Sequence, residues 1–300
     1  MLKVAFAPIY VHPLPKGHRF PMEKYELLPQ QLMHEGTLCE ENFFEPKPAT
    51  FEQVCGVHSK SYVEKLVNLK LSPKEERKTG FKQSKDLIER EFTLAGGTIQ
   101  NSHFALEYGC SLNIAGGTHH AFADRGEGFC LMNDIAISAD LLIRSKKVKR
   151  ILVVDLDVHQ GNGTASIFKQ NESVYTFSMH GKSNYPMQKE NSDLDIPLND
   201  NTKDEEYLRV LFKSLDNVIS SFKPQFVFYL SGVDVLKSDK LGKLDLSIEG
   251  CKQRDVMVFN FCKMNNLPVA VSMGGGYSED IKIILDAHSN TFRKAKEIFY

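Results

Sequence analysis

Hydrophobic residues in the second half of the chain gather in short runs without polar interruptions. Runs that are apolar at every position predict parallel β-strands covered by helices on both faces. The four clearest runs are residues 151–154, 174–177, 226–230 and 269–271. In a parallel sheet, binding and catalytic groups lie beyond the carboxyl ends of the strands. Candidate chemistry is therefore expected directly after each run.

Between these runs the apolar residues recur at helical spacing. A helix is predicted over 203–222, where Thr202 and Glu205 form a capping-box pattern. Further helices are predicted after Asn133 and after Ser247. The alternation of strands and helices predicts an α/β fold with one central, mostly parallel sheet and helices on both of its faces.

Other segments bear on domain organisation. No linker or repeat divides the chain, so we expect a single domain over residues 1–300. The apolar segment 1–11 is short and broken by Pro8, which predicts a buried strand rather than a signal peptide. The polar segment 72–85 is predicted to be a mobile surface loop. No apolar stretch reaches the roughly 20 residues that a membrane span requires.

Composition narrows the class of protein. Hydrophobic residues make up 42% and charged residues 25%, as in ordinary globular proteins. The 37 Lys and Arg residues are balanced by 38 Asp and Glu residues, which argues against direct nucleic-acid binding. Six scattered cysteines without a CxxC pair indicate reduced thiols, so we expect a cytoplasmic protein.

Two carboxylates and an imidazole follow the run at 151–154. In an extended chain Asp155, Asp157 and His159 point to the same side, where a divalent cation would offset their repulsion. Asp234 follows another central run and can complete a three-ligand site with an open position, as a catalytic zinc needs. Oxygen-rich ligation also fits Fe(II) or Mn(II). The alternative is a polar turn in which the following glycines supply the bend.

Adjacent histidines and a tyrosine follow glycine-rich segments elsewhere in the chain. His119 and His120 come after Gly116 and Gly117, and beside a metal such a pair can supply a general base and a general acid. Tyr277 follows three glycines, and its phenol can donate a hydrogen bond to a developing oxyanion. Taken singly, each feature is also compatible with ordinary packing.

Four segments in chain order resemble motifs of the histone deacetylase superfamily of zinc-dependent deacylases: GGTHHAFADRGEGFCLMND, VDLDVHQGNG, SGVD and GGGY. The resemblance covers almost the whole chain. Within the superfamily, residues 18–25 and 159–163 look most like the class IV group and its bacterial relatives. The resemblance implies a single arginase/deacetylase-like domain. It also implies hydrolysis of acyl groups, acetyl and also long-chain fatty acyl, from lysine side chains of a protein or peptide by metal-activated water.

The same resemblance assigns roles to individual residues. It implies zinc on Asp157, His159 and Asp234, with Fe(II) as an alternative. His120 would be the main general base and acid, His119 its partner held by Asp155, and Tyr277 the group that polarises the scissile carbonyl. The substrate-binding residues would be Gly128, Phe129, Tyr185, Leu241 and Gly275. A structural potassium ion would be bound by Asp155, Asp157, His159, Ser178 and the Met179 carbonyl.

The chain departs from the family pattern at two positions. Asn162 stands where many members have Asp behind the second histidine, and a neutral amide can orient His120 without raising its basicity as a carboxylate does. Tyr185 stands where many relatives have Phe in the substrate tunnel, so its hydroxyl is expected to need a polar partner.

Two other functions compete with lysine deacylation. The chain could hydrolyse small acylated amines such as acetylpolyamines, for which Glu127 and Asp239 are the candidate acids at the tunnel mouth. Lys237, Lys240 and Lys243 lie near Asp239 in sequence and oppose that reading. A non-catalytic acyl-lysine binding module would keep the tunnel but lose the reactive groups, and all of these groups are present.

Overall fold

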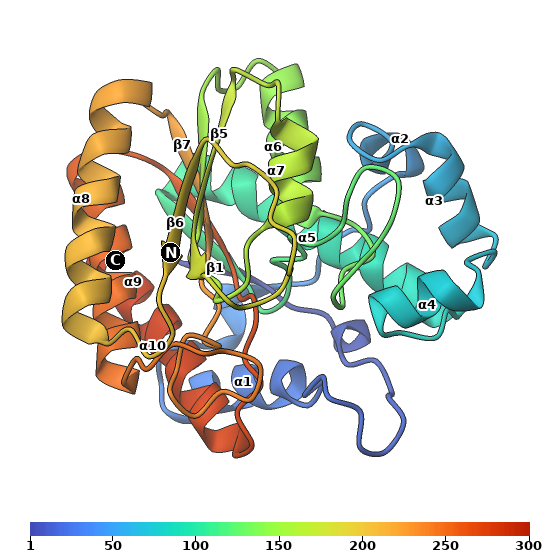
Figure 1. The fold of residues 1–300 in the computed structure, drawn as a ribbon, viewed down its shortest axis with the longest axis horizontal. Coiled ribbons are helices and arrows are strands. Elements are labelled where there is room, and N and C mark those ends of the chain that lie inside the picture. The colour runs from blue at the N-terminus through green and yellow to red at the C-terminus, as the bar shows by residue number, and fades with distance from the viewer.

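The computed structural model describes residues 1–300 and contains one eight-stranded sheet (Figure 1). The strand order is β2-β1-β3-β8-β7-β4-β5-β6, and every neighbouring pair is parallel. The strands are β1 (Lys3–Ala5), β2 (Phe43–Phe44), β3 (Cys110–Asn113), β4 (Ile151–Asp155), β5 (Val174–Gly181), β6 (Leu194–Leu198), β7 (Phe226–Leu230) and β8 (Val269–Ser272).

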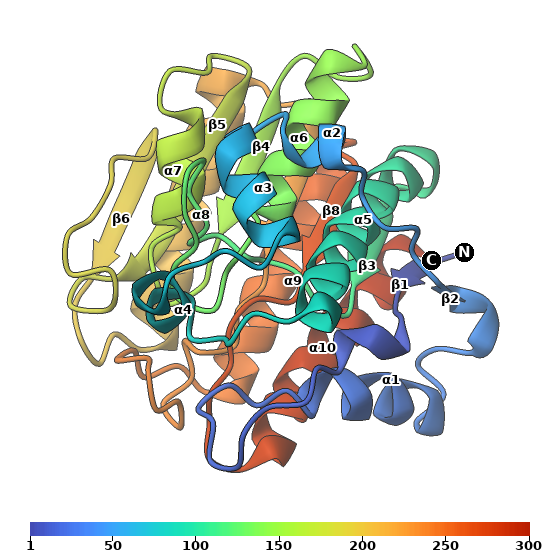
Figure 2. The ribbon, with the colours of Figure 1, turned by 90° about the vertical axis from the view of Figure 1, so that its right-hand side faces the viewer.

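Helices cover both faces of the sheet. The layer formed by α8, α9, α10 and α1 packs on one face, and α5, α6 and α7 pack on the other, with α2, α3 and α4 outside them (Figures 1 and 2). The helices are α1 (Lys24–His34), α2 (Phe51–Val54), α3 (Lys60–Val67), α4 (Pro73–Thr79), α5 (Lys85–Tyr108), α6 (Asp134–Arg144), α7 (Asn162–Phe168), α8 (Asp204–Phe222), α9 (Ile248–Met264) and α10 (Ile281–Phe299). This arrangement confirms the predicted fold class.

Alternate residues of the central strands enter two separate hydrophobic clusters. In β4, Ile151 and Val153 pack with α6, whereas Leu152 and Val154 belong to the large cluster that includes residues of α8 and α9. All five residues of β4 and all five of β7 are buried. The runs are therefore apolar at every position because each side of the sheet is covered.

Several sequence predictions need correction at the level of local structure. The strand expected over residues 1–11 is only β1, because Pro8 begins a 3-10 helix at Pro8–Tyr10. The capping box expected from Thr202 does not form: the helix begins at Asp204, and the Thr202 hydroxyl donates to the Asn199 carbonyl. The four predicted strands and three predicted helices are present.

The segment 72–85 is not a loop but contains α4 and the start of α5. Ser72 caps α4, since its hydroxyl accepts from the Glu75 backbone N–H and the Glu75 carboxylate accepts from the Ser72 N–H. Pro73 stands at the first helical position, where its missing N–H costs nothing. The segment is polar because most residues of α4 face solvent.

No helix of the structure combines the length and the hydropathy that crossing a bilayer demands.

A buried histidine makes stability depend on pH. His58 donates from Nδ1 to the Phe122 carbonyl and accepts at Nε2 from the Asn133 N–H, both at 2.9 Å, so the neutral ring is fully paired. Burial lowers the pKa of His58 to about 4, against the opposing effect of the Phe122 carbonyl. The unfolded chain takes up this proton near pH 6.5 and the folded protein only near pH 4. Acid therefore favours unfolding across that window.

We expect His58 to account for about 3 kcal/mol of the unfolding free energy lost between pH 6.5 and pH 4. Urea unfolding of the wild type and His58→Gln at both pH values measures it, and the stability difference between them should shrink by that amount at pH 4. His34→Gln, at an exposed ring on α1, is the matched control. A difference that stays constant with pH would contradict this assignment.

Candidate metal centre and active site

Four neighbouring strands carry the sequence motifs into one place. The strands β3, β8, β7 and β4 are adjacent in the sheet and parallel. Their carboxyl ends are followed by the segments 114–120, 273–277, 231–234 and 156–159, respectively. Residues separated by more than 150 positions in sequence thus meet at one edge of the sheet.

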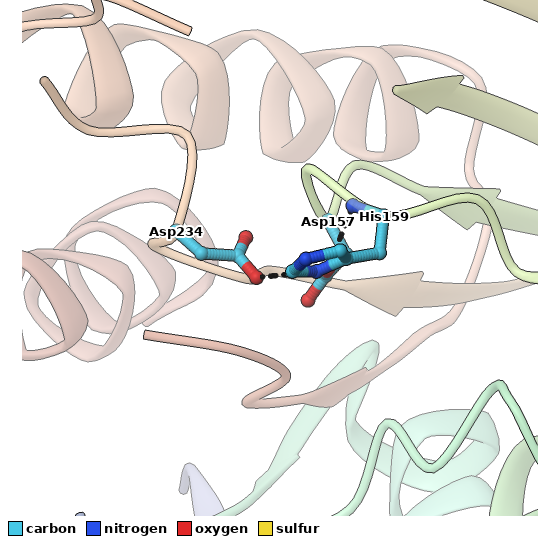
Figure 3. Close-up of side chains that lie close together, drawn as sticks. All are labelled: Asp157, His159 and Asp234. Carbon is cyan, nitrogen blue, oxygen red and sulfur yellow. Dashed lines mark hydrogen bonds and ion pairs between the residues drawn. The ribbon is translucent and has the colours of Figure 1, made fainter. Parts of the chain in front are cut away.

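Asp157, His159 and Asp234 form a buried triad at this edge. Figure 3 shows Asp157 and His159 on the segment after β4 and Asp234 on the segment after β7, with the imidazole between the two carboxylates. His159 Nδ1 lies 3.0 Å from Asp157 Oδ1 and 3.1 Å from Asp234 Oδ2. The three candidate ligand atoms lie within 4.8 Å of one another. The sequence prediction that these residues come together is confirmed.

The outer carboxylate oxygens of the triad are held by the backbone. Gly275 N–H donates to Asp157 Oδ2 at 2.8 Å, and Val158 N–H donates to Asp234 Oδ1 at 2.9 Å. These contacts leave Asp157 Oδ1 and Asp234 Oδ2 turned toward His159. Two carboxylates and one imidazole nitrogen, fixed by outer hydrogen bonds, are the donor set of a catalytic zinc site.

The charge balance of the triad also fits a divalent cation. Two carboxylates exposed by 2% and 0% would be strongly destabilising without compensating positive charge. Burial and the nearby Asp157 charge raise the pKa of Asp234. Although burial opposes it, contact with the two carboxylates raises the pKa of His159 to about 10. The triad thus attracts positive charge, which a 2+ ion would supply.

Two of the residues expected to bind potassium, Asp157 and His159, belong to the triad, and the others lie on β4 and β5. Asp155 and Ser178 are register partners on β4 and β5, and the Ser178 hydroxyl is 3.0 Å from His180 Nδ1. Asp155 Oδ2 accepts from His119, and its Oδ1 accepts from the Asp157 N–H. Met179 follows on β5. The potassium site stays a prediction.

The two adjacent histidines are held by different partners. His119 Nδ1 donates to Asp155 Oδ2 at 2.7 Å, and His120 Nδ1 donates to Asn162 Oδ1 at 2.6 Å. Burial acts against a charged His119, but Asp155 and Asp157 outweigh it and raise its pKa to about 8. Burial and the neighbouring imidazoles His119 and His159 hold the pKa of His120 well below its usual range.

These contacts give the two imidazoles different chemical states. His119 is the cationic member of the pair, and His120 is neutral. Because the Nδ1–H of His120 is committed to the Asn162 amide oxygen, its lone pair is on Nε2. His120 and His159 both line the cavity above the triad. The substitution of amide for carboxylate at position 162 therefore preserves the orientation of the base and removes one negative charge.

Tyr277 is positioned by its backbone rather than by its hydroxyl. Its N–H donates to Asp239 Oδ2 at 2.6 Å, and the hydroxyl forms no hydrogen bond to another residue. The ring stands 6.4 Å from that of His159, centroid to centroid. Burial and the carboxylates of Asp157 and Asp234 raise the pKa of the phenol, so it is protonated and available as a donor.

A tunnel with a volume of about 430 Å³ leads from the surface to His159 of the triad. Its walls include Gly128, Phe129, Tyr185 and Leu241, as predicted. Tyr185 stands edge-on to His120 at 5.0 Å between ring centroids. Its hydroxyl donates to Glu127 Oε2 at 2.7 Å, which confirms the expected polar partner.

A smaller inner cavity of about 40 Å³ lies behind the tunnel. It is lined by the glycines of two motifs, by both adjacent histidines and by residues of α5, among them Gly116, Gly117, Gly275, Leu94 and Arg90. The predicted substrate-binding residue Gly275 lines this inner cavity, where its N–H is committed to Asp157. A side chain at Gly275 would collide with the Asp234 carboxylate.

Sequence reasoning assigned no role to Lys24, which is completely buried beside Tyr277. Its ammonium donates to the Gly274 carbonyl at 3.1 Å and lies 5.8 Å from the centroid of the Tyr277 ring. Burial lowers the pKa of Lys24 to about 8, although Asp234 and Asp157 act in the other direction. A lysine in a helix normally reads as a surface residue. Its place in the segment 18–25 was the one available signal.

Asp134 and Arg254 were also missed, and both hold the loops of the site. The Asp134 carboxylate accepts from the N–H groups of Gly117 and Thr118 at 3.1 and 2.9 Å. Arg254, fully buried on α9, donates to the carbonyls of Leu156 and Gly232 and pairs with Asp255. Both lie on helices, and nothing in their local pattern separates them from capping or surface charges.

A parallel α/β sheet whose carboxyl edge carries a buried Asp–His–Asp triad, an imidazole pair and a phenol defines a hydrolase with a candidate metal centre. Residues 18–291 match the histone deacetylase domain family. The chain therefore belongs to the histone deacetylase family, and membership supports deacetylase activity.

Individual relatives agree with this assignment. An uncharacterized protein of Picosynechococcus sp. is 41% identical over 296 residues, which cover 99% of each chain. Histone deacetylase 2 of Arabidopsis thaliana is 32% identical over 292 residues, covering 93% of this chain and 75% of that protein. The crystal structure of a histone deacetylase homolog from Aquifex aeolicus matches with a TM-score of 0.82 at 25% identity, covering 99% of this chain and 88% of that chain.

Proposed function

We propose that the protein is a zinc-dependent hydrolase that removes acyl groups from lysine side chains of proteins or peptides. The observation that carries the proposal is the convergence of the Asp157–His159–Asp234 triad, the histidine pair and the Tyr277 hydroxyl at the foot of one aromatic-walled tunnel. A divalent ion held by the triad would supply a Lewis acid and lower the pKa of water.

The chain's own residues divide the remaining work. Phe129 and Tyr185 line the tunnel that takes the apolar stem of the acyl-lysine. His120 takes a proton at Nε2 from the attacking water and later gives it to the departing lysine nitrogen. Asp155 accepts from His119 Nδ1 at 2.7 Å and so fixes this ring beside His120. The Tyr277 hydroxyl donates to the carbonyl oxygen as negative charge develops there.

The size of the inner cavity bears on the acyl group. One water needs at least about 10–15 Å³ of such space, so the inner cavity of about 40 Å³ has room for an acetyl group. A long fatty acyl chain would require the cavity walls to move. We expect zinc-reconstituted protein to hydrolyse acetyl-lysine peptides at least about tenfold faster, in kcat/KM, than myristoyl-lysine peptides.

A series of acetyl-, trifluoroacetyl- and myristoyl-lysine peptides at matched concentration tests both the function and the acyl preference. The same series with Fe(II) in place of zinc identifies the more active metal. Absence of turnover of every peptide by either metal form would contradict the proposed function. Preference for the myristoyl peptide would contradict only the acetyl assignment.

The two acids considered as binding sites for an acetylpolyamine, Glu127 and Asp239, already have partners within the protein. The Glu127 carboxylate already accepts from Lys78, Arg125 and Tyr185. Asp239 is buried, and its carboxylate accepts from backbone N–H groups, including that of Tyr277. Neither is free to bind a polyamine. Class IV membership and a cytoplasmic location stay predictions that rest on the sequence.

A further inference from the structure

The residues that line the tunnel cavity include several cations and no carboxylate. Of the sixteen residues that line this cavity of about 430 Å³, four are cationic and none is Asp or Glu. These four rim cations are Arg19 before α1, Arg77 and Lys78 in the last part of α4, and Lys243 on the segment that precedes α9. The whole chain has a net charge of −1, so this concentration is local.

Glu127 pairs with one of the rim cations, Lys78, and leaves the other three unpaired. Glu127 lies 3.1 Å from Lys78 Nζ and 2.9 Å from Arg125 Nε, and it also accepts from the Tyr185 hydroxyl. Although burial opposes it, these contacts lower the pKa of Glu127, which stays ionised. Arg125 also pairs with Asp124 at 3.0 Å, so the cluster of Lys78, Arg125, Glu127 and Asp124 carries no net charge. The uncompensated positive charge of the rim therefore comes from the other three rim cations.

Three rim cations have no anionic partner. Arg77 makes no ion pair or side-chain hydrogen bond, and Arg19 places its guanidinium 5.9 Å from the centre of the Phe129 ring. The Lys243 ammonium donates to the hydroxyl and carbonyl oxygens of Ser183 and forms no ion pair, although Asp200, which accepts from the Ser183 hydroxyl, lies nearby. All three are exposed, so an anionic group of a ligand can reach them without displacing an existing ion pair.

We propose that the rim cations bind acidic residues that flank the acyl-lysine in a peptide substrate, a specificity that rests on the proposed function. Arg77 lies on the α4 side of the tunnel, together with Thr79 and Gly80, whereas Lys243 lies with Ser183 and Leu241. A peptide that inserts its acyl-lysine leaves its flanking residues over the rim. At about 3.3 Å per extended residue, the first two positions on each side reach it.

The form of the charged surface favours a peptide over a nucleic acid. The four rim cations line one cavity. They do not form a continuous basic stripe that would follow a phosphate backbone, and the balanced composition gives no general polyanion affinity. The rim cations would therefore discriminate between peptides by the residues that flank the acyl-lysine.

Three acetyl-lysine peptides with the same length test the proposal: one with Asp and Glu flanks, one with Ser and Gly flanks, and one with Lys and Arg flanks. We expect kcat/KM to be about tenfold higher for the acidic than for the basic peptide at 20 mM salt, chiefly through KM. At 0.5 M salt the ratio should fall below about threefold. Turnover of the neutral peptide tests the proposed function separately, because its flanks carry no charge for the rim cations to bind.

Charge reversal locates the effect on the protein. The double variant Arg77→Glu/Lys243→Glu should invert the ratio, so that the basic peptide becomes the better substrate. Arg209→Glu, at an exposed position of α8 that does not line the tunnel, is the matched control and should keep the wild-type ratio. Circular dichroism and thermal unfolding verify that each variant is folded.

The outcomes separate this proposal from the proposed function. Equal turnover of the three peptides, or a preference unchanged in the double variant, would overturn the rim specificity and leave deacylation intact. No turnover of any peptide would overturn both. A single-stranded RNA that competes as well as the acidic peptide at equal charge would overturn the assignment to peptide substrates.

Discussion

Asp234→Ala will lose both stoichiometric divalent-metal binding and hydrolysis. Asp234 supplies one of the two carboxylates that face His159, and its other oxygen holds the Val158 N–H. Its removal leaves two candidate ligands, fewer than the three that a catalytic zinc site requires. Metal content by atomic emission and turnover of an acetyl-lysine peptide measure the two losses.

Metal-dependent stability distinguishes loss of a ligand from loss of the fold. Zinc at about 100 times its dissociation constant should stabilise the wild type by about 2.7 kcal/mol and leave the variant unchanged. Asp234→Asn keeps an oxygen for the Val158 N–H, and it should be at least as stable as the metal-free wild type, because it removes one of two repelling buried carboxylates. Asp245→Ala, at a carboxylate paired with Lys237 away from the triad, is the control. Normal zinc content in Asp234→Ala would remove this residue from the ligand set.

Tyr277→Phe is expected to lower kcat by about 10²–10³ while metal content, KM and stability stay near wild type. The phenol makes no hydrogen bond within the protein, so removing its hydroxyl leaves no other group without a partner. Its one polar role is donation to an oxygen that becomes negative during the reaction. Such a contact is worth more to the transition state than to bound substrate, so the loss is expected in kcat.

Single-turnover kinetics at saturating acetyl-lysine peptide measure the chemical step directly. Tyr175→Phe, on β5 and also without a hydrogen bond from its hydroxyl, is the matched control and should retain wild-type kcat. A Tyr277→Phe variant with undiminished kcat would remove the phenol from the reaction and leave the triad and the histidine pair to account for catalysis.

The sequence predicts the central strands and the site best, for one physical reason. β4 and β7 are buried on both faces, so residues 151–154 and 226–230 are hydrophobic at every position, and the polar residues that begin at Asp155 and Ser231 mark the sheet edge. The fold class alone therefore predicted that Asp157 and Asp234 lie at the same edge of the sheet. Their convergence with His159 needed no knowledge of side-chain geometry beyond the alternation of an extended chain.

Elements whose residue types are determined by tertiary contacts could not be predicted from the hydrophobic pattern. The longest helix, α5, contains Gly96 and Gly97, which break the helical pattern. A side chain at Gly96 would collide with the Lys47 backbone, and one at Gly97 with the Tyr10 hydroxyl. Edge strand β6 contains Pro197, which the unpaired side of an edge tolerates and which hides the strand in the sequence.

Capping patterns show the same limit on a smaller scale. Thr202 and Ser72 both stand three residues before a glutamate, yet only Ser72 caps its helix. The Thr202 hydroxyl is taken by the Asn199 carbonyl in the preceding turn, and the helix starts one residue later. Lys24 is harder still, because only the tertiary structure shows a charged residue buried beneath the Tyr277 ring.

The position of β8 has a consequence for biosynthesis. This strand is the last of the eight in the chain, yet it lies between β3 and β7 in the middle of the sheet. A nascent chain that has not yet released β8 from the ribosome holds two incomplete half-sheets, each with an unpaired inner edge open to other chains. The same strand brings Gly275 and Tyr277 to the triad. Closing the sheet and completing the catalytic constellation are thus one late event, and no shortened translation product carries a working site.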